Sequence, residues 1–191
     1  MKRNLIIGLL TAGAIFCASA VSAKELQGVS FPDQIKLGDT SLALNGLGLR
    51  LATAFNVKVY VAALYVTQPT NNAAAILGSN TPKELTLHFL RNVDGPDLSK
   101  AWKEGFEKNA KDQLSALQKR INKLESCMSD MKKGERLTFT YTPGKGVEVN
   151  VGGKVAGTIE GEDFAKAFFS IWLGAEPPNK ELKTGLLGTA G

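Results

Sequence analysis

Arg50 is the residue of this chain whose type and surroundings most directly indicate chemistry. It lies in the stretch LNGLGLRLATAFNVKVYVAALY, residues 44–65, where most other side chains are aliphatic or aromatic or the residue is glycine. A guanidinium keeps its charge at every physiological pH, so here it must reach water, meet a carboxylate of the protein or hold an anion from outside. The function of the chain depends on which of these applies.

Tyr60 is the predicted partner of Arg50. If residues 44–65 form a hairpin whose turn is centred on Phe55, Tyr60 lies directly opposite Arg50, with the two Cβ atoms roughly 4.5 to 5.5 Å apart. An arginine fork and a tyrosine hydroxyl can both donate to one carboxylate, so the pair would hold an anionic head group. A register slip of one residue would turn Tyr60 to the other face.

A structural interpretation of the same two residues stays open. Arg50 can instead pair with an internal Asp or Glu or extend to water at a sheet edge, and Tyr60 can be a core aromatic that is hydrogen-bonded to the backbone. Spacing alone does not separate this interpretation from the anion site.

Other reactive residue types are too few for the common catalytic or metal centres. The chain has one histidine, His88, and two cysteines, Cys17 and Cys127, which leaves no plausible zinc cluster and no Ser-His-Asp triad with evident spacing. We therefore expect no metal and no cofactor. His88 is interpreted as a strand residue, and Cys127 as a small buried side chain on a helix rather than a nucleophile.

The first 23 residues have the layout of a secretory signal peptide. A basic start at Lys2 and Arg3 precedes an apolar run over residues 5–17, and small residues end the segment at Ala23. This predicts export to a periplasm or to the cell exterior, with residues 24–191 as a single domain. An uncleaved membrane anchor is the alternative.

The charge and the remaining cysteine limit the partners of the exported chain. The net charge is +5, of which two belong to Lys2 and Arg3, and no dense basic run with interleaved aromatics remains. We therefore expect no nucleic-acid partner, no stable membrane insertion after cleavage, and a monomer. With Cys127 alone, an internal disulfide is excluded.

Strand patterns surround the two candidate residues. Residues 43–66 are rich in strand formers on both faces around a turn near residues 53–56, which predicts two paired strands covered on both sides. Further strands are predicted from alternation and from turn signals such as Pro143-Gly144 and Gly152-Gly153. They span residues 85–89, 137–141, 147–151 and 154–159.

Helical patterns separate these strands. Apolar residues that recur every three or four positions from Leu98 to Met131 predict one long amphipathic helix, or two in sequence, packed on a sheet or on a partner helix. Shorter helices are predicted within residues 71–78, from Phe164 to Gly174, and after Pro178-Asn179. The alternation of strand and helix groups predicts an α+β domain with an antiparallel sheet.

Four motifs resemble the chalcone isomerase family, especially its bacterial chalcone-isomerase-like branch. They are GLGLR, KVYVAALYV, FLRNVDGPDLSKAWKEGF and AFFSIWLGAEPPNKELKTGLLG, and the resemblance covers nearly all of residues 24–191. It implies an open-faced β-sandwich, in which helices cover a large antiparallel sheet and a ligand cleft lies between them.

The resemblance also implies roles for single residues. The family's substrate-binding arginine falls on Arg50, and an active-site threonine falls on Tyr60, as in the fatty-acid-binding members in which an arginine and a tyrosine hold the carboxylate. The catalytic tyrosine falls on Leu98 and a nearby asparagine on Gly105. The threonine and methionine that contact substrate near the end of the chain fall on Ile171 and Trp172.

Arg50 is therefore the one residue kept from the enzymatic set. Ring closure of a chalcone needs donors that position the carbonyl and deliver a proton, and these are replaced by apolar residues. An apolar cleft instead suits an acyl chain, each methylene of which contributes about 0.8 kcal/mol when buried. Ordinary core packing is the alternative for each apolar candidate. The candidate ligand-binding residues are Arg50, Tyr60, Leu98, Trp102, Phe106, Ile171 and Trp172.

Three functional hypotheses follow. The leading one is an exported, non-catalytic protein that binds a fatty acid or a similar apolar carboxylate through Arg50 and Tyr60. The second is a chalcone-isomerase-type intramolecular lyase that acts through Arg50 on an unknown substrate. The third is a structural protein that docks on a partner through the helix at residues 114–131.

Overall fold

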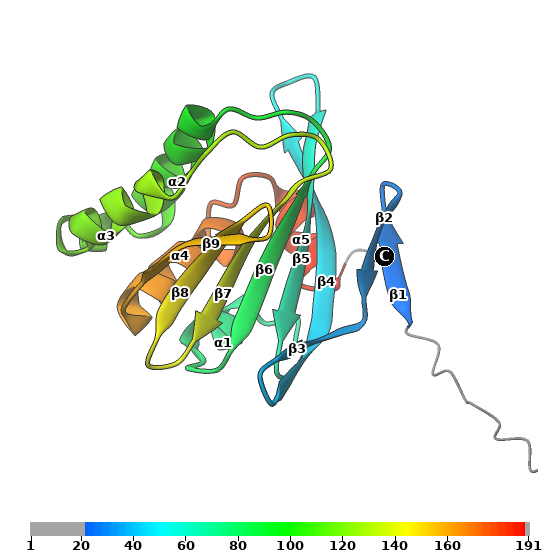
Figure 1. Ribbon diagram of the computed structural model, residues 1–191, viewed down its shortest axis with the longest axis horizontal. Coiled ribbons are helices and arrows are strands. Elements are labelled where there is room, and N and C mark those ends of the chain that lie inside the picture. The colour runs from blue at the N-terminus through cyan, green and yellow to red at the C-terminus, as the bar shows by residue number, and fades with distance from the viewer. Residues whose placement is uncertain (1–21, 190–191) are drawn as a thin grey trace, which may run out of the picture.

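The computed structural model describes residues 22–189. The signal-peptide prediction falls outside this range except for Ser22 and Ala23. The main element is an antiparallel sheet of seven strands, which follow one another across the sheet in chain order (Figure 1). The strands are β3 Gln34–Leu37, β4 Thr40–Ala52, β5 Val57–Val66, β6 Lys83–Phe89, β7 Arg136–Thr142, β8 Gly146–Val151 and β9 Lys154–Ile159. The predicted strands and the α+β class with a large antiparallel sheet are confirmed.

Helices follow β5, β6 and β9. They are α1 Ala73–Gly78, α2 Gly95–Asn109, the 3₁₀ turn η1 Lys111–Gln113, α3 Leu114–Ser126, α4 Glu162–Leu173 and α5 Lys180–Leu186. The long helical pattern after residue 95 is thus two helices, because the backbone leaves the helical region at Ala110, where φ is −141°. None of the helices described within residues 22–189 is long and apolar enough to cross a membrane.

The main core lies between the sheet and the helices on one of its faces. Alternate residues of β5, among them Tyr60, Ala62 and Leu64, face α2 and α4 and are almost fully buried there. Aromatic rings fill much of this space, with Phe168 stacked on Phe164 at a centroid distance of 6.0 Å. This face fixes the positions of the side chains that border the candidate site.

A second, smaller apolar cluster covers the other face of β4 and β5. It is built by a separate hairpin of strands β1 Ala23–Leu26 and β2 Val29–Pro32, whose Val29 and Phe31 pack on the residues of β5 that face away from the helices. The prediction that β4 and β5 are covered on both sides is confirmed. The hairpin itself was not predicted from the sequence.

Helix α5 lies unusually close to strand β4. A Cβ atom on Gly46 would lie 2.1 Å from the carbonyl oxygen of Gly185, and one on Gly48 would lie 2.3 Å from that of Leu182. Two glycines of the GLG motif therefore allow backbone-to-backbone contact, as close approach of this kind requires. Asn45 secures the contact, because its Nδ2 donates to the Leu186 carbonyl at 2.7 Å.

Candidate functional site

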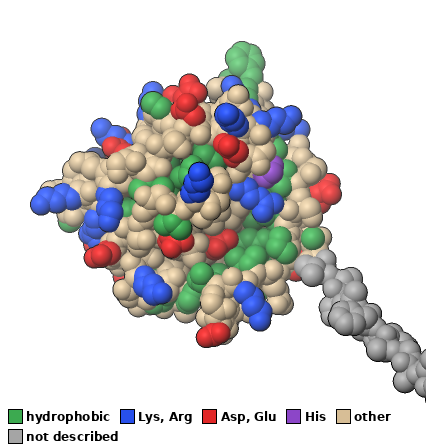
Figure 2. All heavy atoms as spheres, viewed as in Figure 1, with side chains coloured by type: hydrophobic (Ala, Val, Ile, Leu, Met, Phe, Trp, Pro, Cys, Tyr) green, Lys and Arg blue, Asp and Glu red, His purple; other side chains and the backbone are tan. Residues whose placement is uncertain are grey.

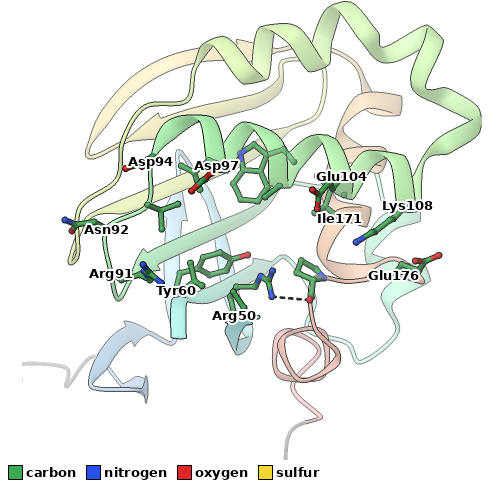
Figure 3. A pocket seen from close by; sticks show the side chains of 18 residues that line it. Arg50, Tyr60, Arg91, Asn92, Asp94, Asp97, Glu104, Lys108, Ile171 and Glu176 are labelled. Atoms are coloured by element: carbon green, nitrogen blue, oxygen red, sulfur yellow. Dashed lines mark hydrogen bonds between the residues drawn. The ribbon is translucent and has the colours of Figure 1, made fainter. Parts of the chain in front are cut away.

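A cleft of about 550 Å³ lies between helix α2 and the turn end of the β4–β5 hairpin (Figure 3). Its walls come from both hairpin strands, the loop after β6, helix α2, and the segment between α4 and α5. Such a volume lies within the range of about 300–1,000 Å³ that is typical of small-molecule sites. The lining includes Arg50, Tyr60, Leu98, Trp102, Ile171 and Pro178.

The register of the hairpin places Arg50 opposite Tyr60, as predicted. The path to this pairing differs from the expected one. Nearer the turn, Leu51 pairs with Lys58, and a bulge at Val59 restores the pairing further along. The turn is therefore not centred on Phe55, and the bulge shifts the register by the one residue that would otherwise have turned Tyr60 away.

Asn179 positions the segment against which Arg50 rests. Strand β3 pairs only with the first residues of β4, so the later edge of β4 has free backbone groups. The Asn179 side chain fills this edge, with Nδ2 donating to the Leu49 carbonyl at 3.1 Å and Oδ1 accepting from Leu51 N–H at 3.2 Å. The neighbouring Pro178 carbonyl is thereby brought to the guanidinium.

The positive charge of Arg50 has no carboxylate partner within residues 22–189. Its Nη1 donates to the carbonyls of Leu51 and Pro178, the latter at 3.2 Å, whereas the ion pair found in this part of the chain joins Arg120 and Asp163. Both acceptors are neutral, so Arg50 has no ion-pair partner, and other donors of the fork are unused. The alternative interpretation, in which Arg50 forms an ion pair with an Asp or Glu of the protein, is therefore not observed within residues 22–189.

Tyr60 offers a second donor beside Arg50. Figure 3 shows its hydroxyl directed toward the guanidinium. The indole Nε1 of Trp172 donates to this hydroxyl at 3.0 Å, and an indole cannot accept in return. No acceptor for the tyrosine hydrogen is found among the hydrogen bonds of the described residues. Burial raises the pKa of Tyr60 to about 12, although the Trp172 hydrogen bond and the Arg50 charge act in the opposite direction, so the hydroxyl remains a donor.

The buried part of the opposite wall is apolar. Leu98 and Trp102 on α2 and Ile171 on α4 line the cleft and are at most 3% exposed. Together with the two donors they form a site with a cationic, hydrogen-bonding floor and a hydrophobic wall. An amphipathic anion fits this combination.

Gly105 and Ile171 form one packing unit within this wall. A Cβ atom on Gly105 would lie 2.6 Å from Ile171 Cγ2 and 2.9 Å from Cγ1. The isoleucine therefore occupies the place that any side chain at residue 105 would need. Gly105 and Ile171 both differ from the residues that the enzymatic members of the family have there, and the contact between them means that a larger residue at 105 would require a smaller one at 171.

Two predicted residues lie behind the cleft rather than on its surface. Phe106 is fully buried, with its ring centroid 5.7 Å from that of Phe164, and it does not line the cleft. Trp172 is 1% exposed and contacts Trp102 at 5.2 Å between centroids. It reaches the site through its hydrogen bond to Tyr60.

Charged residues around the cleft were missed in the sequence. They are Arg91, Asp94, Asp97, Glu104, Lys108 and Glu176, and Figure 3 shows them in two groups at opposite ends of the cleft. Three of them could have been identified from the sequence. Asp97, Glu104 and Lys108 lie at helical spacing along the border between the buried and the exposed faces of α2. Arg91 and Glu176 lie in loops and have no such pattern.

His88 and Cys127 lie away from the cleft. His88 is on the opposite face of the sheet, where its Nδ1 accepts from Arg136 Nε at 3.5 Å, and burial followed by the Arg136 charge lowers its pKa. Cys127 is half-buried just after the end of α3, rather than buried on the helix as predicted, and burial raises the pKa of its thiol. Within residues 22–189, no three His, Cys, Asp or Glu side chains are grouped as metal ligands.

Comparison with known proteins relates the chain to one family. A family model described as chalcone isomerase-like matches residues 23–188. Among solved structures, the chain is similar to the crystal structure of Arabidopsis thaliana fatty-acid binding protein, with a TM-score of 0.63 and 19% identity over 87% of this chain and 96% of that chain. At this identity the similarity shows the fold alone, and the predicted fold is confirmed. No curated protein sequence matches the chain.

Proposed function

The chain belongs to the chalcone isomerase-like family, and from that premise we propose that it is a non-catalytic protein that binds a fatty acid or a similar apolar carboxylate in the cleft. The carboxylate is held by Arg50 and Tyr60, and the acyl chain lies against Leu98, Trp102 and Ile171. No cofactor takes part in this function.

The observation that carries the proposal is the pair of unused donors at the floor of the cleft. Arg50 rests on neutral carbonyls and Tyr60 accepts from Trp172, so both can donate outward to the same anion. Hydrogen bonds that involve a charged group contribute about 1.5–3 kcal/mol each. A pair of this kind within a partly apolar cleft favours a carboxylate over a neutral ligand.

The structural neighbour supports the same class of ligand, since it is described as a fatty-acid binding protein. The apolar wall supports binding over turnover. Leu98 and Ile171 offer no proton, and Gly105 leaves no room for a polar side chain there. The groups that would orient a chalcone and its attacking phenolate are therefore missing from residues 98, 105 and 171 of the cleft.

Export is part of the proposal and rests on residues 1–23. Their basic, apolar and small-residue order is typical of a cleaved signal peptide. Amino-terminal sequencing of the mature protein from fractionated cells would test it. A mature chain that retains Lys2 and Arg3 in the cytoplasmic fraction would contradict export without affecting the binding site.

The central experiment is native mass spectrometry of the purified protein, followed by titration of delipidated protein with palmitate. We expect one fatty acid per chain. Arg50→Ala should weaken binding by about 10- to 100-fold, because it removes a charge-assisted hydrogen bond. The control is Arg136→Ala, which removes an arginine from the opposite face of the sheet and should bind as the parent does.

Tyr60 has to be tested together with Trp172, which donates a hydrogen bond to its hydroxyl. Tyr60→Phe alone would leave the Trp172 indole N–H buried without an acceptor, so it would mix a stability effect with a binding effect. The double variant Tyr60→Phe/Trp172→Phe removes both partners, and it should still bind palmitate about fivefold to tenfold more weakly than Trp172→Phe alone.

The opposite outcomes are equally specific. A parent that takes up no fatty acid, or an Arg50→Ala variant with unchanged affinity, would end the proposal. Conversion of a 2′-hydroxychalcone to the flavanone that disappears in Arg50→Ala would replace it with the isomerase function.

A further inference from the structure

Phe55 is the most exposed large hydrophobic residue in the described part of the chain, at 89%. It lies at the tip of the β4–β5 turn, between Thr53 and Asn56, whose φ angles of 63° and 52° are rare for residues other than glycine. Figure 2 shows a hydrophobic side chain that stands out from the top of the molecule, where Figure 1 places this turn. Packing within the fold does not explain this exposure.

Basic residues lie in the segments next to the turn. Lys58 follows it in β5, Arg91 lies in the loop after β6, and Lys132 and Lys133 lie in the loop before β7; all four are exposed. The segments are tied together by hydrogen bonds, from Leu90 N–H to the Val59 carbonyl at 2.9 Å and from Lys133 N–H to Asn92 Oδ1 at 2.9 Å. We call Phe55, Lys58, Arg91, Lys132 and Lys133 the tip patch.

The acids of the same loops form no ion pair with the tip patch within residues 22–189. The Asp130 carboxylate accepts from Gly95 N–H at 2.9 Å, and that of Glu135 accepts from Lys132 N–H at 2.7 Å. Asp94 lines the cleft. Lys58 Nζ donates to the neutral side-chain oxygen of Gln27 at 2.7 Å, so the charge of Lys58 has no ion-pair partner.

The tip patch is continuous with one end of the cleft. Ala52 and Val59, which flank the turn, line the cleft, and so does Arg91 of the patch itself. A surface that met the tip patch would therefore lie next to this end of the cleft. An exposed aromatic ring with a cationic surround is the combination that binds at the interface of an anionic bilayer.

We infer that the tip patch docks on an anionic lipid surface, with the Phe55 ring inserted at the level of the headgroups and the basic residues against the phosphates. The docking needs no ligand in the cleft. The consequence that an apolar acid then passes directly between the bilayer and the cleft rests on the proposed function.

The test places a tryptophan at the tip. In the full chain, Phe55→Trp is compared with Asn122→Trp, an exposed residue of α3 outside the tip patch. Both are mixed with vesicles of phosphatidylcholine carrying brominated acyl chains, with or without phosphatidylglycerol, and quenching by bromine is recorded. Trp102 and Trp172 are at most 2% exposed, so the parent gives the background. Quenching above this background therefore reports whether the substituted residue itself enters the bilayer.

We expect quenching at residue 55 and none at residue 122, and only with phosphatidylglycerol. Lys132→Ala/Lys133→Ala should weaken partitioning of Phe55→Trp by about 25-fold, roughly fivefold for each charge. Lys119→Ala/Lys123→Ala, which removes two charges from α3, should not change it. Phe55→Ser, measured by cosedimentation against the parent, should lose about tenfold.

Three results would overturn the inference. These are equal quenching at residues 55 and 122, unchanged partitioning of the Lys132/Lys133 variant, and a concentration-dependent change at residue 55 without vesicles, which would assign the patch to contact between two copies of the chain. Docking is measured without fatty acid, and fatty-acid binding without vesicles. Either can therefore fail while the other holds.

Discussion

Gly105→Ala should destabilise the protein although alanine is the better helix former. The added Cβ would lie 2.6 Å from Ile171 Cγ2 and 2.9 Å from Cγ1, whereas carbon atoms in contact prefer about 3.5–4.0 Å. Because both contacts are far shorter than this range, the cost of overpacking lies in the upper part of the usual 1–3 kcal/mol, about 2–3 kcal/mol, and the helix propensity of alanine returns about 1 kcal/mol. We expect a net loss of about 1–2 kcal/mol in the free energy of unfolding.

Substitutions at Ile171 separate this cause from others. Ile171→Ala removes both clashing atoms and alone should cost about 2–5 kcal/mol through the cavity that it leaves. In Gly105→Ala/Ile171→Ala the new methyl group enters that cavity, so the double variant should be about 1–3 kcal/mol more stable than the sum of the single losses predicts. Ile171→Val keeps both γ carbons, so it should give no such relief and serves as the control.

Urea unfolding followed by the fluorescence of Trp102 and Trp172 measures all these variants, because both rings lie in the same layer of the core. A Gly105→Ala variant as stable as the parent would refute the reasoning, and so would equal relief by valine and alanine at residue 171. Confirmation would mean that no polar side chain can return to residue 105 while Ile171 remains.

Three further predictions concern charged and titrating groups. Because burial raises the pKa of Tyr60 to about 12, palmitate binding measured by calorimetry should be constant from about pH 7 to about pH 10, and a fall centred near pH 10 would contradict the proposed role of its hydroxyl. Burial lowers the pKa of Lys83 from 10.5 to about 8, so between these pH values the unfolded chain keeps a proton that the folded chain releases. The free energy of unfolding of the parent, relative to that of Lys83→Met, should therefore rise between about pH 8 and pH 10.5. A difference between the two proteins that does not change with pH would contradict the lowered pKa. Arg120→Ala breaks an ion pair with Asp163 whose side chains are 28% and 55% exposed. It should lower the free energy of unfolding by no more than about 1 kcal/mol, and by less in high salt. A larger loss would contradict the view that this pair behaves as an ordinary surface ion pair.

The pairing of Arg50 with Tyr60 was predictable, but for a reason that was only partly right. The strand formers on either side of residues 53–56 predict the hairpin. Its register depended on a turn centred on Phe55, which the structure does not have. The bulge at Val59 restores the pairing, and bulges have no reliable sequence signal because they depend on how the strand meets its neighbours.

Other parts of the site could not be derived from local patterns. The contact of Trp172 with Tyr60 joins residues 112 positions apart, and only the family resemblance suggested that Trp172 lies near the ligand. The β1–β2 hairpin was missed because its turn, Gln27-Gly28, adopts two positive φ angles without the Asn-Gly or Asp-Gly pair that usually indicates such a turn. Its strands are also only four residues long.

The contact between β4 and the last segment of the chain also sets an order on folding. Arg50 and Asn45 of β4 bond to carbonyls that lie 128 and 141 residues further along. Contacts between such distant residues form slowly, because the intervening chain must first be ordered. During synthesis, the β4–β5 hairpin can form early, but Arg50 gains its support only after Pro178 and Asn179 have emerged. A chain that ends before them would carry both proposed ligand donors without the framework that orients one of them, so the candidate site is among the last parts of the protein to form.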